Sequence, residues 1–201
     1  MIKAIFFDIG GILAIENRDR QYSRLAKIMN FDLKEFMRIR RKNVIPFAEG
    51  KISEKDYLGI FAKKLDLNLK DLRKNWIISA EKNFRIDKDV ERMIKNLNKN
   101  YILGSLTNIT PLHNIVRKKY GVYGNFKINL LSFEQGLMKP NINFYRLMIK
   151  QTGLKPEEIV FVDNYNSYLD PARNLKIKTI LFKDKRDFVD KLKKVDKSFN
   201  K

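Results

Sequence analysis

The chain has 201 residues, of which 44% are hydrophobic and 11% aromatic, enough to bury a core and too many for a disordered chain. It has no cysteine and one histidine, which excludes disulfides, zinc–thiolate sites, cysteine nucleophiles and any mechanism that needs two imidazoles. Its 42 lysines and arginines against 23 acidic residues give a formal charge of +19, which indicates either a basic solvated surface or an anionic partner such as RNA.

The longest uncharged apolar stretch, residues 9–15, is far shorter than the roughly 20 residues that span a bilayer. No positively charged segment followed by an apolar run opens the chain, so we expect no secretory signal. These features predict a cytoplasmic protein with no membrane partner, present as a monomer or a small homo-oligomer.

Short apolar runs rich in β-branched and aromatic residues alternate with helical periodicity along most of the chain. Buried strands that alternate with helices predict a parallel sheet in an α/β fold. The expected strands are residues 2–8, 101–106, 126–131, 159–162 and 178–182, and the expected helices between them are residues 90–98, 112–120, 142–152 and 187–192.

Residues 17–86 break this alternation, because they contain no convincing strand while helical periodicity recurs throughout. Ser53 followed by Asp56 is typical of a capped helix start. The pattern predicts an all-helical cap domain at 17–86, inserted after the first strand, and a core domain formed by 1–16 and 87–201. The expected cap helices are residues 22–29, 33–41, 55–64 and 69–83.

Asp8 ends the first predicted strand, and Gly10 and Gly11 follow it. Parallel sheets bind ligands at the carboxyl ends of their strands, and a buried carboxylate there is costly unless it is paired or binds a metal. Glycines allow backbone N–H groups to approach an anion closely. We therefore expect Asp8 to lie in a crevice under the helical insert, with Gly10 and Gly11 contacting substrate.

The same edge of the predicted sheet collects further polar residues. Thr107 and Asn108 offer a hydroxyl and an amide to phosphate-like oxygens just before a predicted helix. Lys139 adds a positive charge, and Asp163 adds a second carboxylate that suits Mg²⁺ together with Asp8 and water. Two acids, a lysine, a hydroxyl and a divalent ion fit phosphoryl transfer through an aspartyl-phosphate.

Four segments in chain order resemble the four motifs of the haloacid dehalogenase superfamily, and residues 47–57 are similar to the cap of the subfamily whose cap follows the first strand. The resemblance covers residues 2–182. It implies a Rossmann-like α/β core with an all-helical cap inserted after strand one. The segments that carry it are residues 6–13, 106–108, 139–140 and 160–164.

The resemblance also implies a role for each motif residue. Asp8 would be the nucleophile and would bind Mg²⁺ together with Asp163 and the backbone carbonyl of Gly10. Thr107 would bind the phosphoryl group, and Lys139 would hold both the nucleophile and the phosphoryl charge. The implied activity is that of a Mg²⁺-dependent phosphatase acting on a small phosphorylated metabolite, as in the family's sugar-phosphate phosphatases.

The chain departs from the family pattern at three positions. Most family phosphatases carry a general acid–base aspartate two residues after the nucleophile, where this chain has Gly10. Because such catalysis contributes about 10²–10⁴ in rate, we expect a slow enzyme, an easy leaving group or a substitute acid, for which Glu16 is the nearest candidate. Asn164 and Ser167 replace family acids and should weaken Mg²⁺ binding.

Two alternatives stay open. Metal-free 2-haloacid dehalogenases also lack an acid at the place of Gly10, and Arg38, Arg40 or Arg41 would supply their cap arginine, although Asp163 argues against a metal-free site. The second alternative is a catalytically degenerate member that binds RNA through its basic surface, and such binding would weaken steeply with salt.

Overall fold

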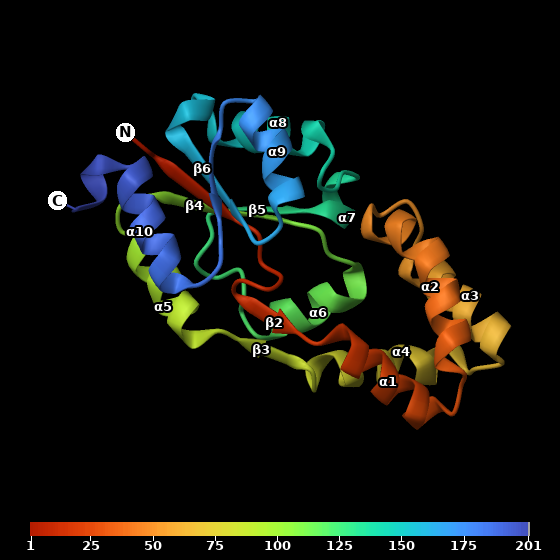
Figure 1. Ribbon diagram of the computed structural model, residues 1–201. Coiled ribbons are helices and arrows are strands. Elements are labelled where there is room, and N and C mark those ends of the chain that lie inside the picture. The colour runs from red at the N-terminus through yellow and green to blue at the C-terminus, as the bar shows by residue number, and fades with distance from the viewer. Residues whose placement is uncertain (201) are drawn as a thin grey trace.

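The computed structural model describes residues 1–200 and contains a parallel five-stranded sheet in the order β5–β4–β1–β6–β7 (Figure 1). Helices cover both faces of this sheet, and the remaining helices stand to one side of it. The predicted parallel α/β fold is therefore confirmed. The strands are β1 (Ala4–Phe7), β4 (Ile102–Thr107), β5 (Ile128–Leu131), β6 (Ile159–Asp163) and β7 (Lys178–Leu181).

The central strand β1 is apolar on both faces because both faces are covered. Ile5 and Phe7 pack into the cluster that includes α5 and α10, whereas Ala4 and Phe6 pack into the cluster that includes α8 and α9. A strand buried this way reads as a continuous apolar run, which explains why the sequence predicts it clearly. The helices are α5 (Lys88–Leu97), α8 (Ile142–Thr152), α9 (Asn166–Asn174) and α10 (Lys185–Val195), and the single turns η1 (Pro156–Glu158) and η2 (Lys197–Asn200) precede β6 and follow α10.

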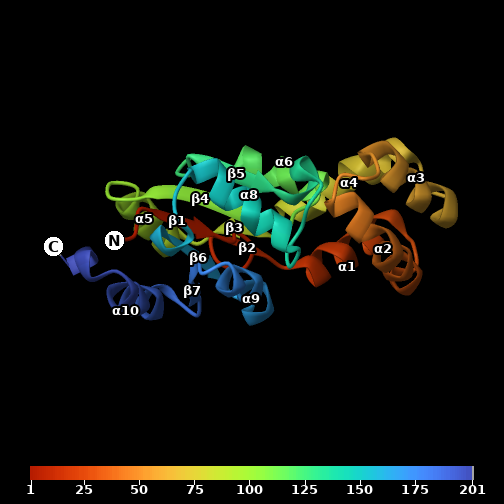
Figure 2. The ribbon, with the colours of Figure 1, turned by 90° about the horizontal axis from the view of Figure 1, so that it is seen from above.

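Helices α1–α4 form the cap at one end of an elongated molecule (Figure 2). Each begins at a polar residue whose side chain accepts a hydrogen bond from a backbone N–H of the first turn, Ser53 among them. Aromatic side chains around Trp76 fill the space between the helices and form a hydrophobic cluster that extends to Leu112 of the core domain. The cap helices are α1 (Arg18–Met29), α2 (Leu33–Ala48), α3 (Glu54–Leu65) and α4 (Leu69–Glu81).

The prediction that residues 17–86 contain no strand was wrong. β3 (Phe84–Ile86) pairs antiparallel with β2 (Ala14–Glu16), so the two chain segments that enter and leave the cap form a small ribbon. Three-residue strands are too short to show a period of two, and they pair only after the fold brings them together. The second cap helix is also longer than predicted, since it runs past residue 41 to Ala48 with Pro46 inside it.

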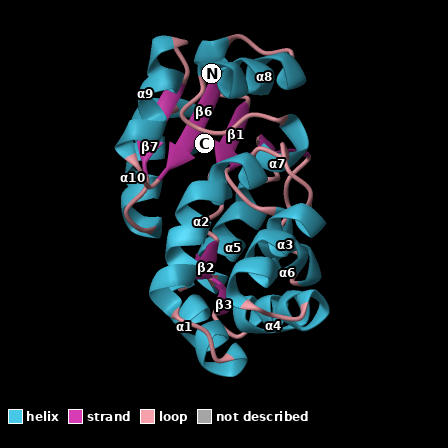
Figure 3. Ribbon diagram, turned by 90° about the vertical axis from the view of Figure 1, so that its right-hand side faces the viewer, coloured by secondary structure: helices cyan, strands magenta, loops and turns pink. Residues whose placement is uncertain are grey.

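Two helices of the core, α6 (Pro111–Lys119) and α7 (Ser132–Gln135), pack against helices of the cap (Figure 3). Helix α6 packs against α4. Helix α7 packs against α2, where Gly50 comes so close that an added Cβ would lie 2.2 Å from the Phe133 carbonyl oxygen. None of the helices described in residues 1–200 is long and apolar enough to cross a membrane.

We expect Gly50→Ala to destabilise the protein more than Gly153→Ala does. Both glycines have positive φ, 68° and 65°, so both substitutions carry the roughly 1–2 kcal/mol penalty of a left-handed conformation. Only Gly50 also meets backbone, because nothing lies within 4 Å of a Cβ at Gly153. Urea unfolding should show at least about 1 kcal/mol more loss for Gly50→Ala, and equal losses would contradict the close approach.

Candidate active site

Asp8 and Asp163 meet because β1 and β6 are adjacent parallel strands in register. Phe7 pairs with Val162, so the next residue on each strand is an aspartate at the same edge of the sheet. Lys139 lies between them, with its Nζ 2.8 Å from Asp8 Oδ1 and 2.6 Å from Asp163 Oδ2. All three residues are buried. Residues of three of the four motif segments therefore form one ion-paired group.

The charges of this group depend on one another. Burial disfavours the ammonium form of Lys139, but Asp8 and Asp163 outweigh that effect and raise its pKa. Burial also raises the pKa of Asp163, as does the neighbouring Asp8, while Lys139 opposes both. The lysine is thus held in its charged form between the two acids.

Asn108 fixes the backbone that carries Lys139. Its side-chain amide donates to the Lys139 carbonyl at 2.9 Å and accepts from the Lys139 N–H at 2.8 Å. Both polar atoms of this amide are therefore engaged in holding the lysine. The predicted contact of Asn108 with substrate stays a prediction.

Arg117, on α6, donates hydrogen bonds to two of the predicted site residues, Glu16 and Thr107. Its Nε donates to Glu16 Oε1 at 2.6 Å, and its Nη1 donates to the Thr107 hydroxyl at 3.2 Å. Arg18 also donates to Glu16, at 3.2 Å. Burial alone would raise the pKa of Glu16, but Arg117 and then Arg18 lower it to about 2.

Gly10 and Gly11 both line the crevice, and a side chain at either position would come close to a neighbouring side chain. Gly11 has a φ of 76°, which favours glycine, and a Cβ there would lie 2.6 Å from Asn164 Nδ2, so the Asn164 side chain would have to shift. Gly10 has no positive φ, but a Cβ there would lie 3.1 Å from Arg117 Nη2. The space beside Gly10 is therefore occupied by a guanidinium group.

A crevice of about 650 Å³ opens above Asp8 and Lys139. It contains most of the predicted site residues, and it also contains residues that the sequence reasoning missed. Its lining includes the predicted Asp8, Gly10, Gly11, Glu16, Asn108 and Lys139, together with Arg18, Arg117, Asn164, Tyr165 and Tyr168.

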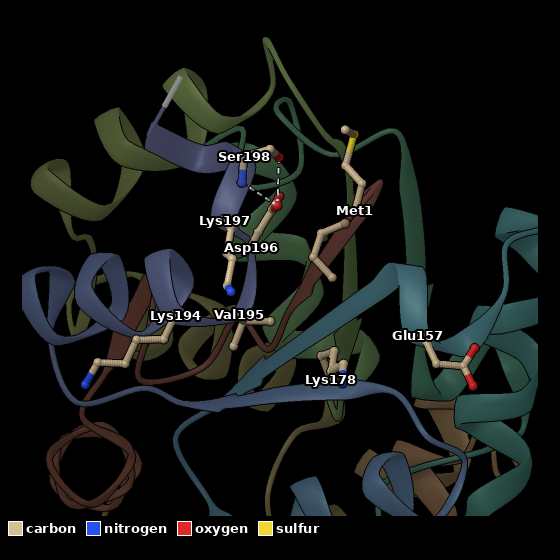
Figure 4. Close-up of a pocket in the computed structure, with 9 residues that line it drawn as sticks. Met1, Glu157, Lys178, Lys194, Val195, Asp196, Lys197 and Ser198 are labelled. Atoms are coloured by element: carbon tan, nitrogen blue, oxygen red, sulfur yellow. Dashed lines mark hydrogen bonds between the residues drawn. The ribbon is translucent and has the colours of Figure 1, made fainter.

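A second hollow, of about 580 Å³, lies at the opposite edge of the sheet, beside the starts of β1 and β7 (Figure 4). Two carboxylates line it, Glu157 and Asp196, and Asp196 is already bonded to the Tyr101 hydroxyl and to Ser198. Lysines gather around it, including Lys178 and Lys194, but it contains no paired carboxylates. The chemistry predicted from the sequence thus belongs to the crevice above Asp8.

The arginines proposed for a dehalogenase substrate are occupied within the cap. Arg40 donates to the Tyr22 hydroxyl at 3.0 Å and lies over that ring, and Arg38 pairs with Glu35 at 2.6 Å. The crevice lining includes neither of them, nor Arg41. The arginines that do line it are Arg18 and Arg117.

One feature of the sequence could have identified Arg117 as a site residue, namely its position on the helix after Thr107. Leu112 and Val116 mark the apolar side of the helix after Thr107, and Arg117 and His113 lie next to them on that side. An arginine on the buried side of a helix is costly unless it is paired, so it indicates an acid or a ligand nearby.

The oxygen atoms around Asp8 fit a hard divalent cation. No group of three His, Cys, Asp or Glu side chains lies together within residues 1–200, so the carboxylates of Asp8 and Asp163 need neutral oxygens beside them. Within residues 1–200, Asn164 Oδ1 is buried without a hydrogen-bond partner, and Gly10, in the loop that follows Asp8, lines the same crevice. Ser167, by contrast, is exposed.

His113 joins the core to the cap. Its Nδ1 lies 2.8 Å from Thr110 Oγ1, and its Nε2 lies 3.0 Å from Gln21 Oε1 on α1. Burial, followed by the nearby Arg18, lowers the pKa of His113 to about 3, although Glu16 opposes this. The imidazole is therefore neutral at physiological pH.

Comparison with known proteins places this geometry in context. The family model described as haloacid dehalogenase-like hydrolase matches residues 2–164. A HAD family enzyme from Bacteroides thetaiotaomicron aligns with a TM-score of 0.82 and 20% identity, over 95% of this chain and 98% of that one. A structure of the same enzyme in complex with magnesium and inorganic phosphate aligns at 0.78 and 21%, over 91% and 95% of the two chains. At this identity the likeness shows the fold alone.

Two further proteins are similar to this chain. The 2-haloacid dehalogenase from Pseudomonas syringae pv. Tomato DC3000 aligns with a TM-score of 0.70 and 16% identity, over 90% of this chain and 86% of that one. Bifunctional epoxide hydrolase 2 from Rattus norvegicus is 34% identical over 71 residues, which are 35% of this chain and 13% of the rat protein. The match thus spans a small part of the length of this relative.

We expect the stability of the protein to fall as the pH drops from 7.5 to 5. Unfolded His113 takes up a proton near its ordinary pKa of 6.5, whereas the folded residue resists protonation down to about 3. The stability is therefore complete above pH 6.5 and is lost progressively below it, by about 2 kcal/mol at pH 5. Urea unfolding across this range should show that slope, and His113→Gln should flatten it. A variant as pH-dependent as the wild type would contradict the assignment.

Proposed function

Since the chain belongs to the haloacid dehalogenase-like hydrolases, we propose that it is a Mg²⁺-dependent phosphatase that hydrolyses a small phosphomonoester through an aspartyl-phosphate on Asp8. The observation that carries the proposal is the Asp8–Lys139–Asp163 group, of which Asp8 and Lys139 line the crevice and Asp163 is buried behind them. A carboxylate held by a buried ammonium, with glycine backbone beside it, suits attack on an anionic phosphoryl group.

In the first step an Asp8 carboxylate oxygen attacks phosphorus and forms the aspartyl-phosphate. The bond from phosphorus to the leaving oxygen breaks, and its electron pair stays on that oxygen. Lys139 orients Asp8 through the 2.8 Å contact and offsets the charge of the phosphoryl group, and Arg117, which donates to the Thr107 hydroxyl, also lines the crevice. Mg²⁺, held by Asp8, Asp163, Asn164 and the Gly10 carbonyl, would supply further charge neutralisation.

In the second step a water oxygen attacks phosphorus and the bond to Asp8 breaks. The electron pair returns to the Asp8 carboxylate, and the water protons leave with the phosphate product. Lys139 stabilises the carboxylate as it re-forms, because its Nζ already contacts Asp8 and Asp163. The chain thereby returns to its starting charge state.

Glu16 does not suit the role of a substitute acid in this scheme. A general acid needs a proton near neutral pH, whereas the pKa of Glu16 is lowered to about 2 by Arg117 and Arg18 against the effect of burial. Its carboxylate accepts from Arg117 Nε at 2.6 Å and stays ionised. We assign Glu16 the function of positioning Arg117.

A 2-haloacid dehalogenase is the second candidate function. It is favoured by Arg18 and Arg117, since two arginines in the crevice suit a substrate carboxylate. Asp163, which is paired with Lys139, favours the phosphatase instead, because its carboxylate is an acid for a cation site. The two functions differ in product and in their dependence on metal.

We expect Asp8→Asn to lower phosphatase activity by more than about 10³-fold, because the amide is no nucleophile. The assay is phosphate release from a panel of phosphorylated metabolites in the presence of Mg²⁺. Asp89→Asn is the matched control, since Asp89 is an exposed acid on α5 that pairs with Arg92. Full activity in Asp8→Asn would end the proposed mechanism.

Removal of metal should separate the two candidate functions. We expect a chelator to abolish phosphate release and added Mg²⁺ to restore it, because the proposed site pairs the carboxylates of Asp8 and Asp163 with a cation. Asp163→Asn should raise the Mg²⁺ concentration needed for half-maximal activity. Halide release from 2-haloacids that persists in chelator would favour the dehalogenase.

A further inference from the structure

Arg117 is a buried guanidinium group with one end unused. Its side chain is 0% exposed, and its Nε and Nη1 donate to Glu16 and Thr107. Nη2 is also buried and has no partner at hydrogen-bond geometry within residues 1–200, although the Tyr123 hydroxyl, which donates to Asn114, lies near the guanidinium. Buried polar groups are nearly always paired, and this residue lines the crevice, so Nη2 is a donor that a ligand oxygen would satisfy.

The absence of a side chain at Gly10 leaves space for Arg117 Nη2. Its φ lies outside the left-handed region, so its backbone conformation is open to other residues. What the position lacks is a side chain, because a Cβ would lie 3.1 Å from Arg117 Nη2 and 3.8 Å from Asp8 Oδ2. The guanidinium thus occupies the space that an acidic side chain at position 10 would enter.

We propose that Arg117 Nη2 binds the leaving oxygen of the substrate as an oxyanion, and that the protein therefore acts on phosphoryl groups carried by acidic leaving groups such as carboxylates, enols or phenols. This inference rests on the proposed phosphatase function and names its substrate class. Glu16 holds the guanidinium in place from the ribbon strand β2.

The chemistry of arginine favours substrates with acidic leaving groups. Burial works against the charge of Arg117, but Glu16 and then Tyr123 and Asp8 raise its pKa further above the ordinary value, so it has no proton to give at neutral pH. When the bond from phosphorus to the leaving oxygen breaks, the electron pair stays on that oxygen, which departs as an anion and takes its proton from water afterwards. A guanidinium stabilises such an anion by a charge-assisted hydrogen bond, and an acidic leaving group can depart without receiving a proton from the protein.

The test is the dependence of kcat/KM on the pKa of the leaving group, measured with a series of substituted phenyl phosphates and one alkyl phosphate. We expect the wild type to hydrolyse 4-nitrophenyl phosphate at least about 10²-fold faster than the alkyl phosphate, since general acid catalysis is worth about 10²–10⁴. Arg117→Gln should lose activity unequally, least for 4-nitrophenyl phosphate and by about 10²-fold more for phenyl phosphate. A purely structural role would lower all substrates by the same factor.

Gly10→Ala provides a second variant that leaves Arg117 unchanged. Its Cβ would crowd Nη2, so we expect the same unequal loss in a smaller amount. Gly59→Ala is the matched control, because the nearest atom to a Cβ there, on Leu69, is 4.0 Å away and lies in the cap. Circular dichroism establishes whether each variant is folded. If Arg117→Gln does not fold, the activity pattern of Gly10→Ala tests the inference.

Each outcome has one meaning. Unequal losses in the folded variants support the inference. Equal losses across the series, or a wild type that hydrolyses all the phosphates at similar rates, overturn it while the phosphatase function stands. Activity that survives in Asp8→Asn overturns the proposed function itself, together with the inference that rests on it.

Discussion

The structure depends on one buried ammonium group that neutralises two carboxylates. Asp8 and Asp163 stand side by side because β1 and β6 are parallel neighbours, and without Lys139 two buried negative charges would face each other. Breaking a buried pair of this kind typically costs about 3–5 kcal/mol. The strand order brings the acids together, and the clamp by Asn108 keeps Lys139 between them.

The parts of the fold that the sequence predicted are those that local pattern determines. β1 and β6 are apolar on both faces, so they read as strands, and the acids that end them could be assigned to one crevice from topology alone. The ribbon strand β3 was missed because its three residues acquire their conformation only by pairing with β2. Asp8, Lys139 and Asp163 were predicted as one site from their residue types and positions, a resemblance implied their roles, and the fold brings them into contact.

What the sequence did not predict is the set of contacts between segments far apart in the chain. Glu16 could be read as a free acid near the nucleophile until Arg117, 101 residues later, is seen to hold it ionised. Asn108 could be read as a substrate ligand until its amide is seen on the Lys139 backbone. In both cases the residue type was informative, and its partner became visible only in three dimensions.

The balance of charge in the crevice explains why the proposal joins a divalent cation to a phosphoryl substrate. Three carboxylates, on Asp8, Glu16 and Asp163, are paired with three cations, on Lys139, Arg117 and Arg18, while the other acid of the crevice lining, Asp19, is exposed to solvent. The group is therefore close to neutral before any ligand enters, and a phosphomonoester dianion would leave two uncompensated negative charges in a partly buried site. A divalent cation held by Asp8 and Asp163 offsets both of them. Gly10 contributes to this balance, because an aspartate at that position would add a fourth carboxylate beside the unpaired nitrogen of Arg117.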